Sequence, residues 1–497
     1  MFYRNCNSGA GQERPSQPSA ADEECGAHSL SDLPSAANTA RVLSRRQWLG
    51  QTSLGFGAMA LAGLQAEQAV AGAVSSTLPH AFPRAKRIIL LFMQGGQSQM
   101  DLFDPKPDLK GLDGQSVDKK GGKKKYKGSP FRFTRYGQSG LEMSELLPHL
   151  GGCADDLCVV RSMVTGSANH SNAMLQFHTG SQNFVRPSVG SWTVYGLGAE
   201  SDSLPGFITI RPSRAHGTRV YSSAFLPAFY QGAALGHDGV PIAKAKFRYL
   251  TNSQWTPSQQ RAQMALTQSF NRKFSQENAT TAEMEGLIDS YELAFRMQTE
   301  APDLFDLSKE PQYILDLYGV GQKKTDEVGR MCLLSRRFAE SGVRFIQLNH
   351  AGWDHHGSID SGLRNSCQAV DQPIAALLTD LKQRGMLEET LVVSSGEFGR
   401  TATAEGEGAK AGRGHNANGF SLWMGGGGIQ GGMSYGQTDA LGIRAVENRV
   451  PIHDLHATML HCLGIDHERL TYHYAGRDFR LTDVYGNVIQ DILKYSG

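Results

Sequence analysis

The sequence predicts an α/β fold in which a mostly parallel sheet carries helices on both faces. Three observations support this prediction: short continuous apolar runs, helical stretches between them, and Gly-rich exits where the runs end. Strands buried on both faces are typically continuous apolar runs rather than alternating ones. Strands that alternate with helices along a chain indicate a parallel sheet covered on both sides.

The expected elements follow in chain order. Residues 87–93 form a buried strand that ends in Gln94-Gly95-Gly96, and residues 157–163 form a second strand. A helix is expected over 171–179, closed by Gly180, and a long helical stretch over 256–300 as a lid or flanking layer. Strands at 343–348 and 391–394 and helices at 362–385 and 453–463 complete the series. In such sheets functional groups collect at the carboxyl ends of the strands.

Length and charge narrow the class of protein. A chain of 497 residues can bury a large core, as one large α/β domain or as two or three domains. The 49 basic residues against 48 acidic ones argue against a nucleic-acid partner. Residues 119–127 are a basic loop, either a polyanion site or simply a solvated surface. The seven cysteines contain no CxxC, and Cys153 and Cys158 are expected to be buried thiols rather than a disulfide.

The N-terminal region predicts export. Residues 1–40 are rich in small and polar residues, which is typical of disorder. Residues 41–73 contain paired arginines, Arg45 and Arg46, then a modest apolar stretch and a run of small residues, as in a twin-arginine signal. A membrane anchor is the alternative, but the apolar run is shorter than the ~20 residues that span a bilayer. We therefore expect the twin-arginine export machinery as a partner, and a mature domain over 74–497 that is periplasmic or secreted, with no transmembrane helix.

Carboxylates and imidazoles follow the predicted strands. Mixed ligands of this kind suit zinc, manganese or iron. The candidate metal ligands are Asp101, Asp354, His356, Glu397 and His415. Other roles remain open for their neighbours: Asp104 could cap a helix, His350 and His355 could be hydrogen-bonded wall residues, and His170 could cap the following helix or line a pocket.

Several motifs together resemble the DUF1501 family over residues 40–497. They are Gly95-Gly96 with Ser98, Asp101 and Phe103-Asp104-Pro105, then Trp353-Asp354-x-His356, Glu397-Phe398-Gly399-Arg400-Thr401, Gly412 to His415, and a tail from Asp454 to Val484. The resemblance implies the alkaline phosphatase and sulfatase superfamily. It therefore implies a three-layer α/β/α sandwich with a metal site at the strand ends.

The motifs of the sulfatase branch can be aligned with this chain one by one. Its nucleophile position falls on His170, with Ser171 beside it, and its Asp-His pair falls on Glu397 and Phe398. Phe398 cannot bind a metal, and Gly414 stands where many family members have Asp, so the resemblance favours one metal, or two with a reduced shell. It implies a hydrolase for a phosphate or sulfate ester in which Ser171 or His170 faces the reacting group and Arg400 clamps its anionic oxygens. The alternative is a secreted binding or surface protein that kept the fold and lost the chemistry.

Overall fold

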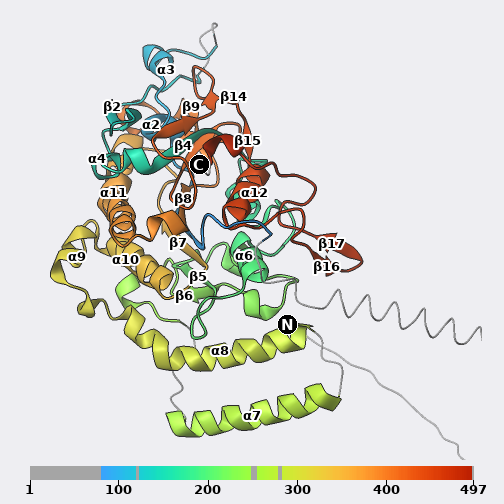
Figure 1. Cartoon of the computed structure of the whole chain (residues 1–497). Helices are drawn as coiled ribbons and strands as arrows, with labels where there is room; N and C mark the ends of the chain where they lie inside the picture. The colour runs from blue at the N-terminus through green and yellow to red at the C-terminus, as the bar shows by residue number, and fades with distance from the viewer. Residues whose placement is uncertain (1–79, 119–122, 248–254, 278–281, 495–497) are drawn as a thin grey trace, which may run out of the picture. The chain divides into compact units, whose positions relative to one another are not determined.

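The computed structural model describes residues 80–118, 123–247, 255–277 and 282–494 (Figure 1). All described residues belong to one compact unit. The predicted disordered segment and twin-arginine signal lie outside the described residues. Within the described part, no helix is both long and apolar enough to cross a membrane.

A nine-stranded sheet forms the centre of the described unit. Its strand order is β12-β4-β11-β8-β1-β7-β5-β6, with β15 also pairing with β4. The pairs β1/β7, β1/β8, β5/β7, β5/β6, β12/β4 and β15/β4 are parallel, and only β11 runs antiparallel to its neighbours β4 and β8. The bounds are β1 Arg87–Gln94, β4 Leu157–Val164, β5 Phe207–Ile210, β6 Ala233–Leu235, β7 Phe345–Ala351, β8 Thr390–Ser395, β11 Phe420–Gly425, β12 Met433–Tyr435 and β15 Val450–Pro451.

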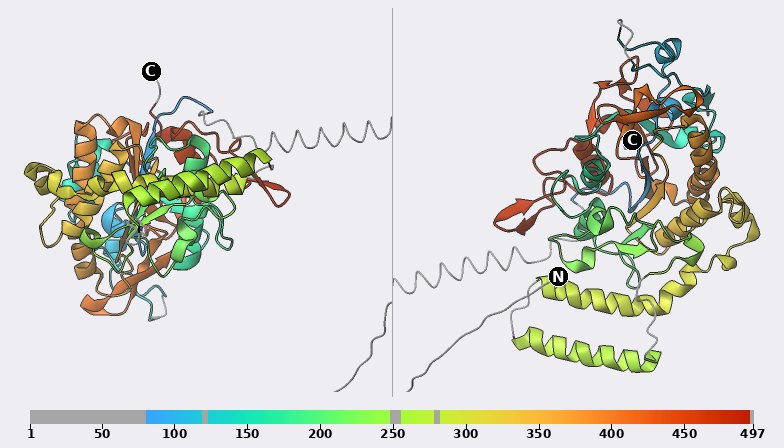
Figure 2. Two further views of the ribbon diagram at one scale, coloured as in Figure 1. Left: turned by 90° about the horizontal axis from the view of Figure 1, so that it is seen from below. Right: turned by 180° about the vertical axis from the view of Figure 1, so that it is seen from behind.

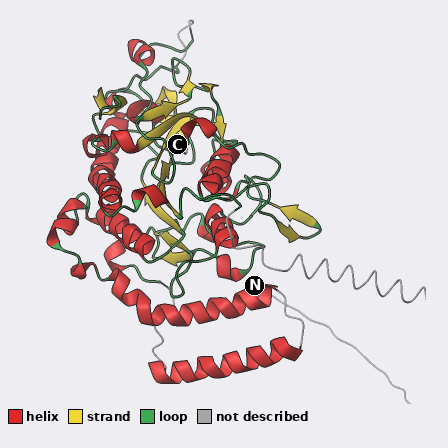
Figure 3. Ribbon diagram, viewed as in Figure 1, coloured by secondary structure: helices red, strands yellow, loops and turns green. Residues whose placement is uncertain are grey.

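The sheet separates two hydrophobic cores, which confirms the three-layer α/β/α prediction. Alternate residues of β1 point to opposite faces, so Ile89 and Leu91 join one core while Ile88 and Leu90 join the other. The first core is covered by α10 (Asp326–Glu340) and α11 (Ile359–Gln383), and the second by α5 (His170–Thr179), α6 (Val189–Leu197) and α12 (Ile452–Cys462). Figures 2 and 3 show these helices on the two sides of the strands.

The remaining elements are short or lie beyond the sheet. The predicted helical stretch over 256–300 divides into α7 (Pro257–Glu277) and α8 (Ala282–Phe305). The strand expected at 343–348 instead runs to Ala351, which brings His350 into β7. The other bounds are α2 Gln99–Leu102, α3 Pro107–Gly111, α4 Pro148–Gly151, α9 Gln312–Leu317, β2 Phe133–Tyr136, β3 Leu141–Ser144, β9 Gly399–Glu405, β10 Gly412–Asn416, β13 Gln437–Thr438, β14 Ala445–Glu447, β16 Tyr472–Tyr474 and β17 Arg477–Phe479.

The cysteines and the basic run are the subject of two local predictions. Cys153 and Cys158 are free, buried thiols, as expected. Residues 123–127, the described part of the basic run, include paired residues and are not wholly a loop. Tyr126 forms a bridge with Thr403 of β9, and the neighbouring N–H of Lys127 donates to Ala402 O at 2.9 Å. Lys123, Lys124 and Lys125 remain exposed.

Candidate metal centre

Four side chains converge beyond the carboxyl end of the sheet. They are His170 at the start of α5, Asp354 and His356 on the segment after β7, and His415 on β10, and one potential ligand atom from each lies within 4.8 Å of the others. Asp354 Oδ1 lies 3.0 Å from His356 Nε2 and 3.1 Å from His415 Nε2. Asp354 Oδ2 lies 3.2 Å from His170 Nε2. The structure thus brings three of the five predicted ligands together with His170.

Each imidazole in this group is held from behind through Nδ1. The Nδ1 partners are Glu397 Oε1 at 2.5 Å for His170, Glu405 Oε2 at 2.5 Å for His356, and Ala168 O at 2.8 Å for His415. A carbonyl oxygen and an ionised carboxylate can only accept, so these bonds place the ring proton on Nδ1. When the rings are neutral, all three Nε2 lone pairs therefore face the same small space, which is how histidines are oriented around a metal.

This arrangement fits a divalent cation. His356 Nε2 and His415 Nε2 lie only 2.9 Å apart, and two lone pairs at that distance repel unless a cation or proton lies near them. His170 Nε2 is buried and has no hydrogen-bond partner among the described residues. Three imidazole nitrogens and one carboxylate match the ligands that zinc prefers, and they also suit manganese or iron.

The charges around Asp354 favour its ionised form. Burial alone would raise the pKa of Asp354, but the guanidinium of Arg400 and the rings of His415 and His170 lower it well below its usual range. Burial would lower the pKa of His170, yet the carboxylates of Glu397 and Asp354 outweigh it and raise that pKa. For His415 the effect of burial dominates and its pKa is lowered, which favours a neutral, ligating ring.

Glu397 contacts His170 on the side away from the other three converging residues. Its side chain is completely buried and accepts from the N–H of Gly95 at 3.1 Å as well as from His170. Gly95 has φ +117°, and a Cβ there would meet Asp354 N at 2.5 Å, so a glycine is required where the exit of β1 packs against the segment carrying Asp354. Glu397 therefore positions His170 and this backbone, and the structure does not place it among the four converging groups.

Asp101 is not brought to the cluster, contrary to expectation. Arg413 Nε lies 2.7 Å from Asp101 Oδ2 and Arg413 Nη2 lies 3.1 Å from Oδ1, and neither side chain is exposed. Ser98 Oγ donates to the same carboxylate at 2.5 Å. Burial would raise the pKa of Asp101, but Arg413 lowers it. The carboxylate neutralises a buried arginine, a partner that the sequence did not reveal.

Arg400 also has a different role from the one expected. Its side chain is completely buried, and it donates to the carbonyl oxygens of Gly96 at 2.9 Å, Arg413 at 3.1 Å and Trp353 at 3.2 Å, and to that of Gly95. Nη2 also donates to Asp354 Oδ1 at 2.5 Å. Because every nitrogen of the guanidinium is bound inside the protein, Arg400 positions Asp354 and does not present a clamp to a ligand.

The alternative roles expected for His170 and His350 can be decided from their contacts. Asn169 caps α5 by accepting from the N–H groups of Ser171 at 3.0 Å and Asn172 at 3.4 Å, so His170 is not the cap and Ser171 is exposed. His350 accepts from Trp353 Nε1 at 3.0 Å, as the wall-residue alternative expected. Burial, with Arg211 nearby, lowers the pKa of His350 to about 4.

Comparison with known proteins identifies the family. A family model described as "Protein of unknown function (DUF1501)" matches residues 85–493. The chain belongs to the DUF1501 family. No curated protein matches this DUF1501 chain.

Solved structures resemble the DUF1501 chain only distantly. The PsFucS1 sulfatase from Pseudoalteromonas sp. is 13% identical with a TM-score of 0.36, over 78% of this chain and 69% of that one. The alkaline phosphatase from the Antarctic bacterium TAB5 is 12% identical with a TM-score of 0.30, over 69% and 92%. The C-terminal periplasmic domain of EcEptC from Escherichia coli is 9% identical with a TM-score of 0.34, over 78% and 84%. Similarity at this level says nothing about chemistry.

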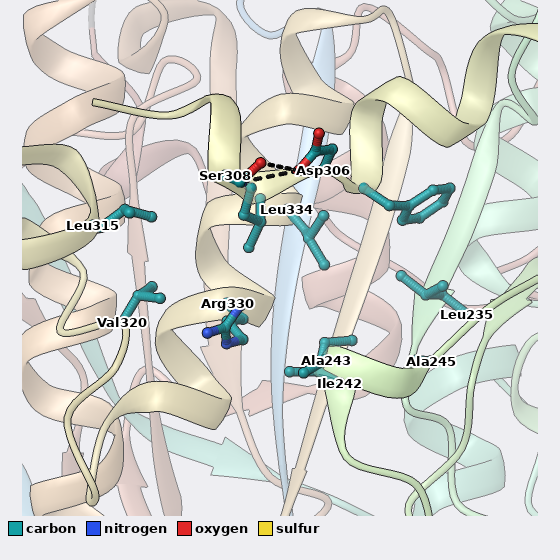
Figure 4. Close-up of a pocket in the computed structure, with 12 residues that line it drawn as sticks. Leu235, Ile242, Ala243, Ala245, Asp306, Ser308, Leu315, Val320, Arg330 and Leu334 are labelled. Atoms are coloured by element: carbon teal, nitrogen blue, oxygen red, sulfur yellow. Dashed lines mark hydrogen bonds between the residues drawn. The ribbon is translucent and has the colours of Figure 1, made fainter. Parts of the chain in front are cut away.

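One cavity of this DUF1501 protein lies away from the four converging residues. About 380 Å³ in volume, it is lined by apolar side chains such as Leu235, Leu315 and Leu334, with Arg330 and Asp306 among them (Figure 4). None of the four converging residues lines it, so the chemistry does not coincide with this cavity. Glu405 stands in no motif of the sequence and does not directly follow a predicted strand, so sequence reasoning missed it. Arg413 stands in the Gly412 to His415 motif, but its pairing with Asp101 has no local signal.

Proposed function

We propose that this DUF1501 protein is an exported, metal-dependent hydrolase that acts on a phosphate or sulfate ester. The observation that carries the proposal is the convergence of three imidazole Nε2 atoms on Asp354, with every Nδ1 already bonded to an acceptor. Residues held in this way are preorganised ligands, because their lone pairs have no other partner to satisfy.

Different residues of the chain would bind the metal, orient its ligands and face the substrate. Asp354, His356 and His415 would hold the ion, and Arg400 would fix the Asp354 carboxylate. A bound divalent ion would supply Lewis-acid activation of water and of the ester oxygens. His170 and Ser171 stand at the N-terminal end of the ten-residue helix α5, where the partial positive charge favours an anionic ester group.

One observation favours a second candidate function. His170 offers a fourth protein ligand beside Asp354, His356 and His415. Structural zinc sites are filled by four protein ligands, whereas catalytic sites keep one position open. If His170 ligates permanently, the centre is closed, and the protein is a secreted binding or surface protein that uses the metal for stability.

Metal analysis with turnover assays separates the two functions. We expect about one divalent ion per purified chain, as a single four-donor site requires. Hydrolysis of p-nitrophenyl phosphate or sulfate that disappears in Asp354→Ala would support the hydrolase. A wild type that contains the metal but shows no turnover would favour the closed centre. The same holds if His170→Ala, in which one coordination position is open, also shows no turnover. Absence of metal from the wild type would refute both.

A further inference from the structure

Of the two carboxylates that accept from these histidines, Glu405 is exposed and Glu397 is not. Glu405 ends β9 and its side chain is 49% exposed, whereas that of Glu397, behind His170, is completely buried. The third acceptor is the backbone oxygen of Ala168. His356 therefore depends on a flexible side chain for its orientation, at the open side of the cluster.

Gly414 has no side chain, and the Glu405 carboxylate occupies the space next to it. The pairing of β9 with β10 shifts between Arg413 and His415, and Gly414 lies at the irregularity, with its N–H donating to Thr401 Oγ1 at 2.9 Å. A Cβ on Gly414 would clash with Glu405 Oε1 and would lie 3.3 Å from Glu405 Cδ. A larger residue at 414 would therefore shift the Glu405 carboxylate, whose Oε2 lies 2.5 Å from His356 Nδ1.

We infer that Glu405 is a positioning residue that orients His356 for metal binding, and that Gly414 makes room for the Glu405 carboxylate in this position. The inference rests on the proposed function, since it concerns the same centre. A carboxylate behind a metal-ligating histidine fixes the ring tautomer and raises the basicity of Nε2, and removing such a partner typically costs about 10–100-fold in metal affinity. An exposed Glu–His pair without a metal role would instead contribute little to folding and nothing to metal binding.

The first test compares zinc affinity, measured by competition with a chromogenic chelator, in full-length protein. Glu405→Ala should weaken zinc binding about 10–100-fold. Glu405→Gln should lose less, because its amide oxygen still accepts the Nδ1 proton. The control is Glu407→Gln, which changes an exposed glutamate two residues further along and should leave affinity unchanged. The visible spectrum of the cobalt-substituted protein should change in Glu405→Ala and not in the control, because the orientation of one ligand changes.

A double-mutant cycle tests the part played by Gly414. Gly414→Ala should weaken zinc binding in the wild type but cost little more in the Glu405→Ala background, where the clash no longer exists. Equal losses in both backgrounds would show that Gly414 acts independently of Glu405 and would overturn that half of the inference. Wild-type zinc affinity in Glu405→Ala would overturn the inference while leaving the proposed centre intact. A wild type that binds no zinc would refute the proposed function itself.

Discussion

Arg413 Nε lies 2.7 Å from Asp101 Oδ2, in an ion pair that is completely withdrawn from solvent. The two residues are far apart in sequence, and each belongs to a motif that suggests ligand chemistry. In the folded protein each neutralises the other. Removing one partner of a buried pair leaves an uncompensated charge. We therefore expect a substitution of Asp101 to affect the stability of the protein, whereas the sequence suggested a role for Asp101 in metal binding.

Asp101→Asn should destabilise the protein by about 3–5 kcal/mol, because Arg413 would remain buried without its counter-charge. Urea denaturation measures the loss. Asp108→Asn, at an exposed aspartate of α3, is the control and should have little effect. Normal stability combined with lost metal would instead show that Asp101 is a ligand.

Zinc should stabilise the wild type. An ion that binds only the folded state adds about 2.7 kcal/mol when its free concentration is 100 times the dissociation constant. His415→Ala should abolish this gain in melting experiments, while His473→Ala, at an exposed histidine of β16, should retain it. Melting that is unaffected by zinc or by a chelator would contradict the metal centre.

Ser171→Ala should leave turnover nearly unchanged, whereas Asp354→Ala should reduce it by more than about 100-fold, since a direct ligand matters at least as much as an outer partner. Initial rates with aryl phosphate and aryl sulfate measure both, with metal content determined on the same samples. If Ser171→Ala abolishes turnover with the metal retained, the Ser171 hydroxyl is the nucleophile and requires activation by the metal or a base.

Stability should fall in acid because of two buried histidines. Burial lowers the pKa values of His178 and His456 to about 3, from an ordinary value of 6.5. No described group hydrogen-bonds either ring nitrogen of His178. Between pH 6.5 and 3 the unfolded chain binds more protons than the folded one, so this stability is present above pH 6.5 and decreases as the pH falls.

The variant His178→Phe isolates one of these groups. Its free energy of unfolding should depend less steeply on pH between 4 and 6, by about 1.4 kcal/mol per pH unit, the value for one proton. Urea titrations in the presence of a chelator measure this slope without a contribution from metal release. An unchanged slope would mean that His178 can be protonated in the folded state.

Export should depend on the paired arginines. Changing Arg45 and Arg46 together to Lys should block export, and N-terminal sequencing of the exported wild type should find a start near residues 72–75, where the small-residue run ends. Cell fractionation measures the first effect. Normal export of the double variant would contradict the twin-arginine interpretation.

The sequence by itself determined the central strands and part of the candidate metal centre. β1, β4 and β8 were predictable because strands buried on both faces are typically near-continuous apolar runs. Asp354 and His356 were predictable as a pair because two residues on one irregular segment after a strand can reach the same point. The break between α7 and α8 and the extension of β7 to Ala351 have no comparable local signal.

Only the tertiary structure decided which charged groups face a ligand and which face each other. Asp101 with Arg413, His356 with Glu405, and His170 with Glu397 are pairs separated by 312, 49 and 227 residues. A carboxylate after a strand has the same local sequence whether it binds a metal, an arginine or an imidazole. Its role depends on which opposite charge or hydrogen-bond donor the fold brings within about 3 Å, because a buried charge without a partner is too costly to keep.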